Sequence, residues 1–191
     1  MPITYTNRKQ TLFTLYQKPN KKGALRYYFS QKPSAGATPV EIIPAGYEIY
    51  ENVNAQVFLR KIKPSPITKE ELDLVNAAMR QYGKVERYQI DVKGKRIVVY
   101  TPVADVDAIL ETFNEFAYSQ ARIDTFMRQI RWSDVMRFEL VDRTARTFQA
   151  QRYSFLGRID DWIDIGSPGD LESLTRQYVP HIEQETYYTL Y

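Results

Sequence analysis

The sequence predicts an α+β protein in which a small antiparallel β-meander head precedes an α+β body. Short β-branched and aromatic runs, separated by turns rich in Pro, Asn and Gly, fill residues 1–62. Two prolines interrupt the chain at 63–66, and the first helical periodicity follows them. We therefore expect a basic, tyrosine-rich antiparallel β-module at 1–62, a proline-rich linker at 63–66 and an α+β domain at 67–191.

The head carries signals for two β-hairpins. Strands are expected at 11–17 and 25–31, joined by a turn at 18–23 that contains Pro, Asn and Gly. A second pair is expected at 47–51 and 56–62, joined by a turn with two asparagines. Asn and Gly tolerate the left-handed backbone that tight turns require. A meander of about four strands fits this pattern.

The body begins with a well-marked helix. Thr68 and Glu71 have the spacing of a capping box, in which each side chain binds the backbone N–H of the other residue. Gly83 is placed to end the helix. One face is apolar and consists of Leu72, Val75, Met79 and Tyr82. Strands are then expected at 85–92 and 96–101, with a turn at 93–95 between them.

Residues 103–156 contain neither Gly nor Pro, which favours long elements. Apolar residues at heptad-like spacing predict one long helix over about 105–131, with a bend near 118–120 left open. This stripe consists of Ile109, Phe113, Phe116, Gln120, Ile123, Met127 and Ile130. Strands are expected at 136–140, 147–155 and 158–165. The long helix, together with the first and last helices, should cover an antiparallel sheet.

The last helix is expected to begin at Ser167. Serine is a common N-cap, Pro168 suits the first helical position, and Asp170 would complement the helix dipole. Leu171, Leu174 and Tyr178 would then point inward, and the helix would end near Pro180. The aromatic segment 187–191 should dock as a strand or against a partner, because frayed chain ends are usually polar.

Composition narrows the possible chemistry. The chain has no cysteine and a single histidine, His181, which excludes thiolate metal sites, disulfides and histidine pairs. We expect no cofactor. No apolar run approaches the length of a membrane helix, and residues 1–10 lack the apolar core of a secretory signal, so we expect a cytoplasmic protein without membrane contact.

Charge is divided unevenly along the chain. Residues 1–63 contain 10 Lys and Arg against 3 Asp and Glu, whereas residues 64–191 contain 16 against 20. Basic residues among tyrosines can bind phosphates and stack on bases. The candidate nucleic-acid contacts are Lys18, Lys21, Lys22, Arg26 and Lys61. The alternative is that the aromatic residues form the core of a small sheet and the lysines keep its surface soluble.

The densest acidic segment lies at 160–164. Asp160, Asp161 and Asp164 could ligate Mg²⁺ or Ca²⁺ through oxygen, or act as an acid–base pair. Metal-dependent sites usually gather acids from several elements, and no second acidic cluster accompanies this one. The alternative is an acidic strand edge with Trp162 buried and an ion pair to Arg158.

Several segments spread over nearly the whole chain resemble one group of bacterial proteins that are described only as hypothetical. These segments are 5–9, 27–30, 43–52, 56–60, 136–142, 160–164 and 178–181. The resemblance implies a bacterial, cytosolic origin. It carries over no catalytic or binding residue.

Three hypotheses for function follow. The first is a non-enzymatic binding or adaptor protein whose basic head contacts nucleic acid or an acidic partner. The second is a metal-dependent hydrolase or nuclease that uses the three aspartates at 160, 161 and 164. The third is a component of a homo-oligomer in which the aromatic residues at 187–191 lie between subunits. The absence of a known catalytic motif favours the first.

Overall fold

The computed structural model describes residues 1–156 and 159–191, and its fold is α+β. Over these residues, antiparallel sheets of 11 strands combine with 4 α-helices, so the predicted fold class is confirmed. The chain forms two compact units, the first made of Met1–Pro64 and Ala108–Ile130, the second of Ser65–Asp107 and Arg131–Tyr191. The predicted domain limits at 62 and 67 stay a prediction, because a compact unit need not fold alone.

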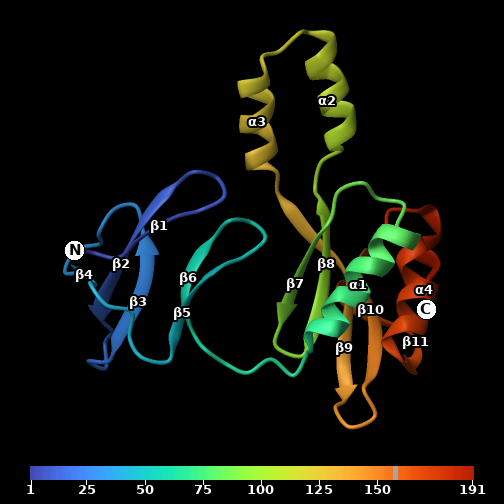
Figure 1. Ribbon diagram of the computed structural model, residues 1–191, viewed down its shortest axis with the longest axis horizontal. Helices are drawn as coiled ribbons and strands as arrows, with labels where there is room; N and C mark the ends of the chain where they lie inside the picture. The colour runs from blue at the N-terminus through green and yellow to red at the C-terminus, as the bar shows by residue number, and fades with distance from the viewer. Residues whose placement is uncertain (157–158) are drawn as a thin grey trace. The chain divides into compact units, whose positions relative to one another are not determined.

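The first sheet is centred on β2. Strands β1 (Thr4–Thr6), β2 (Leu12–Pro19), β3 (Leu25–Ser30) and β4 (Thr38–Pro39) pair antiparallel, and β2 contacts the other three (Figure 1). The strands expected at 11–17 and 25–31 correspond to β2 and β3. Sequence reasoning missed β1 and β4, because two or three residues are too few to show an alternating pattern.

Strands β5 (Tyr47–Glu51) and β6 (Val57–Lys61) form a separate two-stranded sheet that packs against the first. The rings of Tyr27 and Tyr47 lie 5.9 Å apart between the two sheets. The buried amide of Asn7 donates to the carbonyl of Ala55 at 2.7 Å. The side chain of Glu51 accepts from the Tyr5 hydroxyl at 2.9 Å and from Nε of Arg8 at 2.8 Å.

The second unit is built on a five-stranded antiparallel sheet. Its strands are β7 (Gln89–Lys93), β8 (Arg96–Pro102), β9 (Trp132–Asp142), β10 (Thr147–Leu156) and β11 (Ile159–Gly169), in the order β11-β10-β9-β8-β7. Helices α1 (Lys69–Tyr82) and α4 (Leu171–Tyr178) lie side by side on one face of it (Figure 1). The 3₁₀ helices η1 (Val179–His181) and η2 (Glu185–Thr189) follow α4.

Alternation along the strands decides which residues enter the core of this unit. In β9, Met136, Phe138 and Leu140 are buried, whereas the residues between them are only partly so. Val75 and Met79 of α1 pack against this face of the sheet. The apolar face that the sequence predicted for the first helix is therefore confirmed. No helix of the described chain is long and apolar enough to cross a membrane.

Helix α1 begins with the predicted capping box. The backbone N–H of Glu71 donates to Thr68 Oγ1 at 3.3 Å, and the Thr68 N–H donates to a carboxylate oxygen of Glu71 at 2.9 Å. The same carboxylate accepts from Nε of Arg146, in the β9–β10 turn, at 2.8 Å. Arg146 also donates to the carbonyl of Pro66 at 3.0 Å. One glutamate thus fixes both the start of α1 and its position beside the sheet.

Helix α4 does not begin where the sequence predicted. Ser167 and Pro168 belong to β11, and the N-cap is Asp170, whose carboxylate accepts from the Ser173 N–H at 2.8 Å. Pairing of Gly169 with Phe148 of β10 extends the strand through the expected cap. The inward positions were predicted correctly, since Leu171, Leu174 and Tyr178 are all buried.

The prediction of a single long helix over about 105–131 is wrong. Two helices form instead, α2 (Val106–Glu115) and α3 (Gln120–Gln129), and they make a helical hairpin (Figure 1). The chain turns at Ala117, which adopts a left-handed conformation with φ of 49°. Phe113 of α2 meets Phe126 of α3 edge to face, with ring centroids 5.3 Å apart.

The C-terminal aromatic segment forms the 3₁₀ helix η2 and not a strand. Tyr187 is buried within the second unit, and its hydroxyl donates to the carbonyl of Val135. Burial raises the pKa of this hydroxyl well above its usual range. Arg152 of β10 is buried as well, and its Nε donates to the carbonyl of Leu190 at 3.0 Å. Tyr188 and Tyr191 stay exposed.

Candidate functional site

Two cations and two tyrosines share one face of the first sheet. Lys18 of β2 pairs with Arg26 of β3, and two residues away Tyr16 pairs with Tyr28. Side chains at paired positions, and at positions two residues apart, leave a sheet on the same side. The tyrosine rings lie 6.0 Å apart. The register of this hairpin thus gathers basic and aromatic groups that the sequence separates by about ten residues.

The turn between β2 and β3 is held by Asn20. Its side-chain oxygen accepts from the backbone N–H groups of Lys22 and Ala24, at 2.8 and 3.1 Å. Its backbone carbonyl accepts from Gly23, which has a left-handed φ of 80°. Such Asx bonding keeps a short turn in one conformation. Lys21 is therefore carried by an ordered turn that directly follows β2.

The loop after β3 folds back over the same face. The hydroxyls of Tyr28 and Ser34 are hydrogen-bonded at 2.6 Å, and Lys18 Nζ donates to the carbonyl of Ala35 at 2.6 Å. A lysine ammonium has three donors, so Lys18 keeps two for another partner. These two bonds position the loop and also orient Lys18.

Together these segments line an open pocket of about 510 Å³, which we call the basic pocket. It is lined by Lys18, Pro19, Asn20, Lys21, Arg26, Tyr28 and Ser34. No Asp or Glu of the described chain is among these lining residues.

The acidic residues of segment 1–64, all of it described, are bound elsewhere. Glu48 pairs with Arg60 at 2.8 Å, Glu51 pairs with Arg8 at 2.8 Å, and Glu41 pairs with the Met1 amine at 3.2 Å. The hydrogen bonds from Arg8 and Tyr5 outweigh burial, which alone would raise the pKa of Glu51, and hold that pKa below its ordinary value. No carboxylate of segment 1–64 is therefore left to neutralise the cations of the basic pocket.

The predicted contacts fall into two groups. Lys18, Lys21 and Arg26 line the basic pocket. Lys22 is exposed in the same turn but does not line it, and Lys61 is exposed on β6 in the other sheet. Sequence reasoning missed Ser34 as a lining residue. The signal was the Pro- and Gly-containing run at 33–39, which predicts a loop but not the surface on which it folds.

The aromatic residues of the head divide between the two roles that the sequence left open. Tyr27 packs on Tyr47, and Phe29 meets Tyr5 with ring centroids 6.5 Å apart, so these rings build the small core. Tyr16 and Tyr28 lie on the opposite face with the cations. The predicted role in the core of a small sheet therefore applies to Tyr5, Tyr27, Phe29 and Tyr47. Tyr16 and Tyr28 lie on the other face and remain available to a ligand.

The acidic segment 160–164 does not gather into one cluster. Adjacent residues of β11 alternate between its two faces, so Asp160 and Asp164 point away from the side of Asp161. Asp160 accepts from the Tyr153 hydroxyl, and Asp164 accepts from the Gln151 amide at 2.5 Å. In the part of the chain that is described, no group of three or more His, Asp or Glu is arranged to hold a metal ion.

The expected ion pair to Arg158 lies outside the described residues. Trp162 is half-buried beneath a different arginine, since the Arg137 guanidinium carbon lies 4.2 Å from the centroid of the indole. Arg137 also donates to the Gln151 side chain at 2.5 Å. The single histidine is engaged locally, because His181 Nδ1 lies 2.7 Å from Thr186 Oγ1. The metal hypothesis stays a prediction without support from this geometry.

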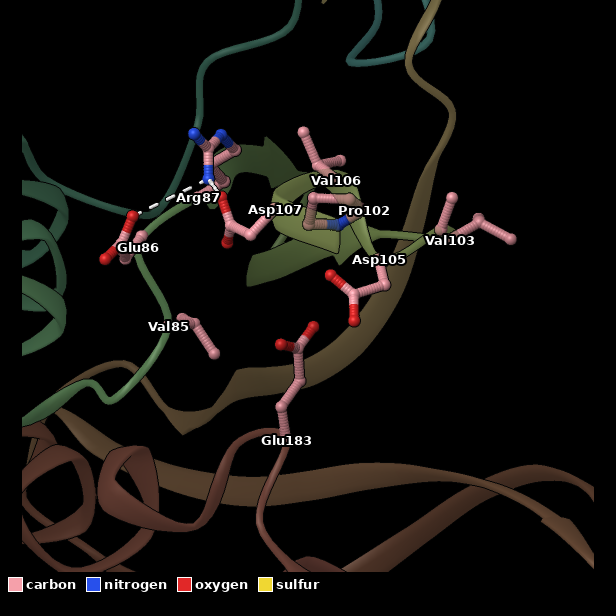
Figure 2. Close-up of a pocket in the computed structure, with 10 residues that line it drawn as sticks. Val85, Glu86, Arg87, Pro102, Val103, Asp105, Val106, Asp107 and Glu183 are labelled. Carbon is pink, nitrogen blue, oxygen red and sulfur yellow. Dashed lines mark hydrogen bonds and ion pairs between the residues drawn. The ribbon is translucent and has the colours of Figure 1, made fainter. Parts of the chain in front are cut away.

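A second pocket, in the other unit, is acidic and has a volume of about 360 Å³. Figure 2 shows Asp105 and Glu183 directed toward one another across it, while Arg87 pairs with Asp107 and, at 3.6 Å, with Glu86. Sequence reasoning missed this grouping, because Glu183 lies about eighty residues beyond the others. An acidic pocket alone does not define a ligand, since solvated carboxylates are common on protein surfaces.

Comparisons with family models, with curated proteins and with solved structures found no match to this chain. No residue role is therefore transferred from another protein. The resemblance to bacterial hypothetical proteins stays a prediction. The function proposed below rests on the basic pocket.

Proposed function

We propose that this protein is a non-enzymatic binding protein that binds single-stranded nucleic acid through the basic pocket of its first unit. The observation that carries the proposal is that Lys18, Lys21 and Arg26 line one open pocket whose lining contains no described carboxylate. We also place the protein in the cytoplasm, where such a ligand is abundant.

The pairing of Lys18 with Arg26 supports an anionic ligand. Like charges at directly paired strand positions destabilise a sheet. The head contains acidic residues that could have relieved this repulsion, yet all of them bind other cations. A phosphate placed between the two side chains would remove the repulsion and gain charge-assisted hydrogen bonds. Where a natural protein departs from such a local rule, the departure is often at a functional site.

The tyrosines favour nucleic acid over an acidic protein. Tyr16 and Tyr28 lie on the face that carries the cations, and their rings remain partly exposed. Single-stranded nucleic acids are held by basic grooves that bind the backbone and by aromatic faces on which bases stack. An acidic peptide would use the cations but would gain little from the rings. The hydroxyls of Tyr28 and Ser34 add further hydrogen-bonding groups at the pocket.

The experiment measures binding of a labelled single-stranded oligonucleotide by fluorescence anisotropy over a series of salt concentrations. Two triple variants remove the same charge: Lys18→Gln/Lys21→Gln/Arg26→Gln in the pocket, and Lys22→Gln/Lys32→Gln/Lys61→Gln outside it. We expect the pocket variant to bind at least ~10-fold more weakly than the control. Its slope of log K against log salt should be shallower by ~0.7 for each phosphate that the variant no longer neutralises.

Three outcomes would contradict the proposal. The first is undetectable oligonucleotide binding by the native chain at low salt. Equal weakening in both triple variants would show that total charge matters and the pocket does not. Competition by polyglutamate as effective as competition by unlabelled oligonucleotide would favour an acidic protein partner.

A further inference from the structure

The first unit carries another open pocket, with a volume of about 600 Å³, which we call the uncharged pocket. It is lined by Met1, Pro2, Thr4, Thr14, Tyr16, Pro33, Ala37 and Pro39. No Lys, Arg, Asp or Glu is among these described lining residues. Proline rings, methyl groups and a tyrosine ring make its walls mostly apolar. A phosphate that entered it would lose hydration without gaining a partner of opposite charge.

The strand register places the uncharged pocket on the same face of the first sheet as the basic pocket. Thr14, Tyr16 and Lys18 alternate along β2 and therefore leave it on one side. Thr4 of β1 pairs with Thr14, and Pro39 of β4 pairs with Tyr16, so both share this face. Thr14 and Lys18 are separated by roughly 13 Å at the rise of a β-strand. The two pockets are therefore neighbouring parts of one surface.

Two features join the pockets. The loop after β3 lines both, since Ser34 lines the basic pocket while Pro33 and Ala37 line the uncharged pocket. The second feature is the pair of tyrosine rings that lie 6.0 Å apart. Tyr28 of this pair lines the basic pocket, and Tyr16 lines the uncharged pocket. A ligand that fills one pocket can therefore continue over the tyrosines into the other.

We infer that the uncharged pocket is a base-binding subsite, which holds a base of the same single strand whose phosphates bind in the basic pocket. The inference rests on the proposed function and adds which part of the ligand each pocket takes. A nucleotide joins an anionic phosphate to an uncharged aromatic ring. The surface likewise joins a cationic pocket to an uncharged one, with aromatic rings between them on which bases can stack. The strand would run from Lys18 across Tyr28 and Tyr16 toward Thr14.

The threonines favour a base over the acyl chain of an anionic lipid. Thr4 and Thr14 occupy paired positions in the uncharged pocket, and each brings a hydroxyl that can donate and accept a hydrogen bond. The edge of a base can form such bonds, whereas an acyl chain would displace water and leave the hydroxyls unpaired. Because a hydroxyl can take either role, the subsite should accept any base with little sequence preference.

The test compares two labelled ligands that have the same length and the same phosphates. One is oligothymidylate, and the other is the same chain with every base replaced by a tetrahydrofuran abasic unit. Fluorescence anisotropy over a series of salt concentrations gives both affinities. We expect the native chain to bind oligothymidylate at least ~10-fold more tightly, because bound bases add to the affinity. The slopes of log K against log salt should be equal, since the phosphate contacts are the same.

Two substitutions in one loop separate the subsite from the basic pocket. Ala37→Leu places a larger side chain in the uncharged pocket. Ala35→Leu makes the same change at an exposed residue that is not among the described lining residues of either pocket. Ala37→Leu should reduce the advantage of oligothymidylate to less than ~3-fold without weakening the abasic ligand. Ala35→Leu should leave both affinities unchanged.

A second variant keeps the test valid if Ala37→Leu does not fold. Tyr16→Leu removes the ring from the uncharged pocket and retains an apolar side chain on β2. It should also reduce the advantage of oligothymidylate. In each variant, unchanged affinity for the abasic ligand shows that the basic pocket is still folded.

Failure of this inference can be distinguished from failure of the proposed function. If the native chain binds neither ligand at low salt, the proposed function is wrong and the subsite is wrong with it. Equal binding of both ligands overturns the subsite alone. An advantage of oligothymidylate that persists in both Ala37→Leu and Tyr16→Leu also overturns it, because the bases then bind elsewhere. Tighter binding to phosphatidylglycerol vesicles than to oligothymidylate would assign the uncharged pocket to an acyl chain and overturn it as well.

Discussion

Lys18 and Arg26 occupy directly paired positions on β2 and β3, so two cationic side chains leave the same face of the sheet opposite each other. Nothing acidic lines the pocket around them, within the described chain. Like charges at directly paired positions are expected to lower the stability of a sheet, and they raise the local positive potential. Stability and binding should therefore respond in opposite directions when this pair is changed.

Arg26→Glu should stabilise the first sheet and weaken oligonucleotide binding. The substitution converts a like-charged cross-strand pair into an opposite-charged one, which contributes roughly 0.2–1 kcal/mol. Urea denaturation followed by the near-UV CD of the tyrosines measures the change in the free energy of unfolding. Lys22→Glu makes the same change of charge in the exposed turn and should alter stability by less than about 0.5 kcal/mol. Destabilisation by Arg26→Glu would show that Arg26 has a structural partner.

The first unit should lose stability in acid through Glu51. Its folded pKa lies below the ordinary value, because the bonds from Arg8 and Tyr5 outweigh burial. A lowered folded pKa contributes stability that is complete above the unfolded pKa and is lost as the pH falls through the folded pKa. Glu51→Gln should therefore lower stability at neutral pH and flatten the decline below about pH 5. Parallel urea titrations of both proteins between neutral and acid pH measure this, and an unchanged pH profile would contradict it.

Sequence patterns correctly predicted the elements that depend on residues close together in the chain. Thr68 and Glu71 form the capping box expected from their spacing, and the alternation of Met136, Phe138 and Leu140 correctly gave the buried face of β9. The start of α4 could not be predicted in this way. Ser167 carries a strong N-cap signal, but pairing between Gly169 and Phe148, distant in sequence, extends the strand through it.

The candidate site was predicted in part for a similar reason. The sequence shows that Lys18, Lys21 and Arg26 flank a turn, so their proximity could be expected. The place of Ser34 in the lining could not be expected, since it depends on the bond between the hydroxyls of Ser34 and Tyr28. Nor could sequence distances show that every acidic residue of the head binds a cation outside the pocket.

Gly166→Ala should be more destabilising than Gly94→Ala. Both glycines have a left-handed φ, of 62° and 63°, so both substitutions carry the backbone penalty of about 1–2 kcal/mol. An added Cβ at Gly166 would overlap the Tyr178 hydroxyl oxygen, while at Gly94 it would meet nothing within 4 Å. Thermal denaturation should show an extra destabilisation of at least ~1 kcal/mol at Gly166. Adding Tyr178→Phe should recover part of it, and no recovery would contradict this contact.

Arg152 should hold the C-terminal segment by hydrogen bonds and not by an ion pair. It is 1% exposed, donates to the carbonyls of Leu190 and Tyr188, and its buried Nη1 has no partner in the described chain. Arg152→Ala should cost about 2–4 kcal/mol. Arg152→Met fills much of the volume and removes a buried charge, so its cost should be smaller. Chemical denaturation measures the loss of stability in both variants. Hydrogen exchange at 185–191 should accelerate in each variant. An equal loss of stability in the two variants would contradict this role of Arg152.

Ala117→Gly distinguishes a helical hairpin from the single long helix that the heptad-like spacing predicted. In a continuous helix, glycine is less favourable than alanine by about 1 kcal/mol, so the variant would lose stability and helical signal. In the structure Ala117 has a φ of 49°, where an L-residue with a side chain is disfavoured by about 1–2 kcal/mol and glycine is not.

The substitution should therefore stabilise the hairpin, which urea denaturation monitored by far-UV CD would report as a later transition without loss of helical signal. Ala121→Gly provides the matched control, because Ala121 lies inside α3 and glycine there should be destabilising in either arrangement. Loss of stability in both variants would mean that the helix continues through Ala117. A gain at Ala117 with a loss at Ala121 requires a turn between Phe113 and Phe126, the turn that brings their rings together.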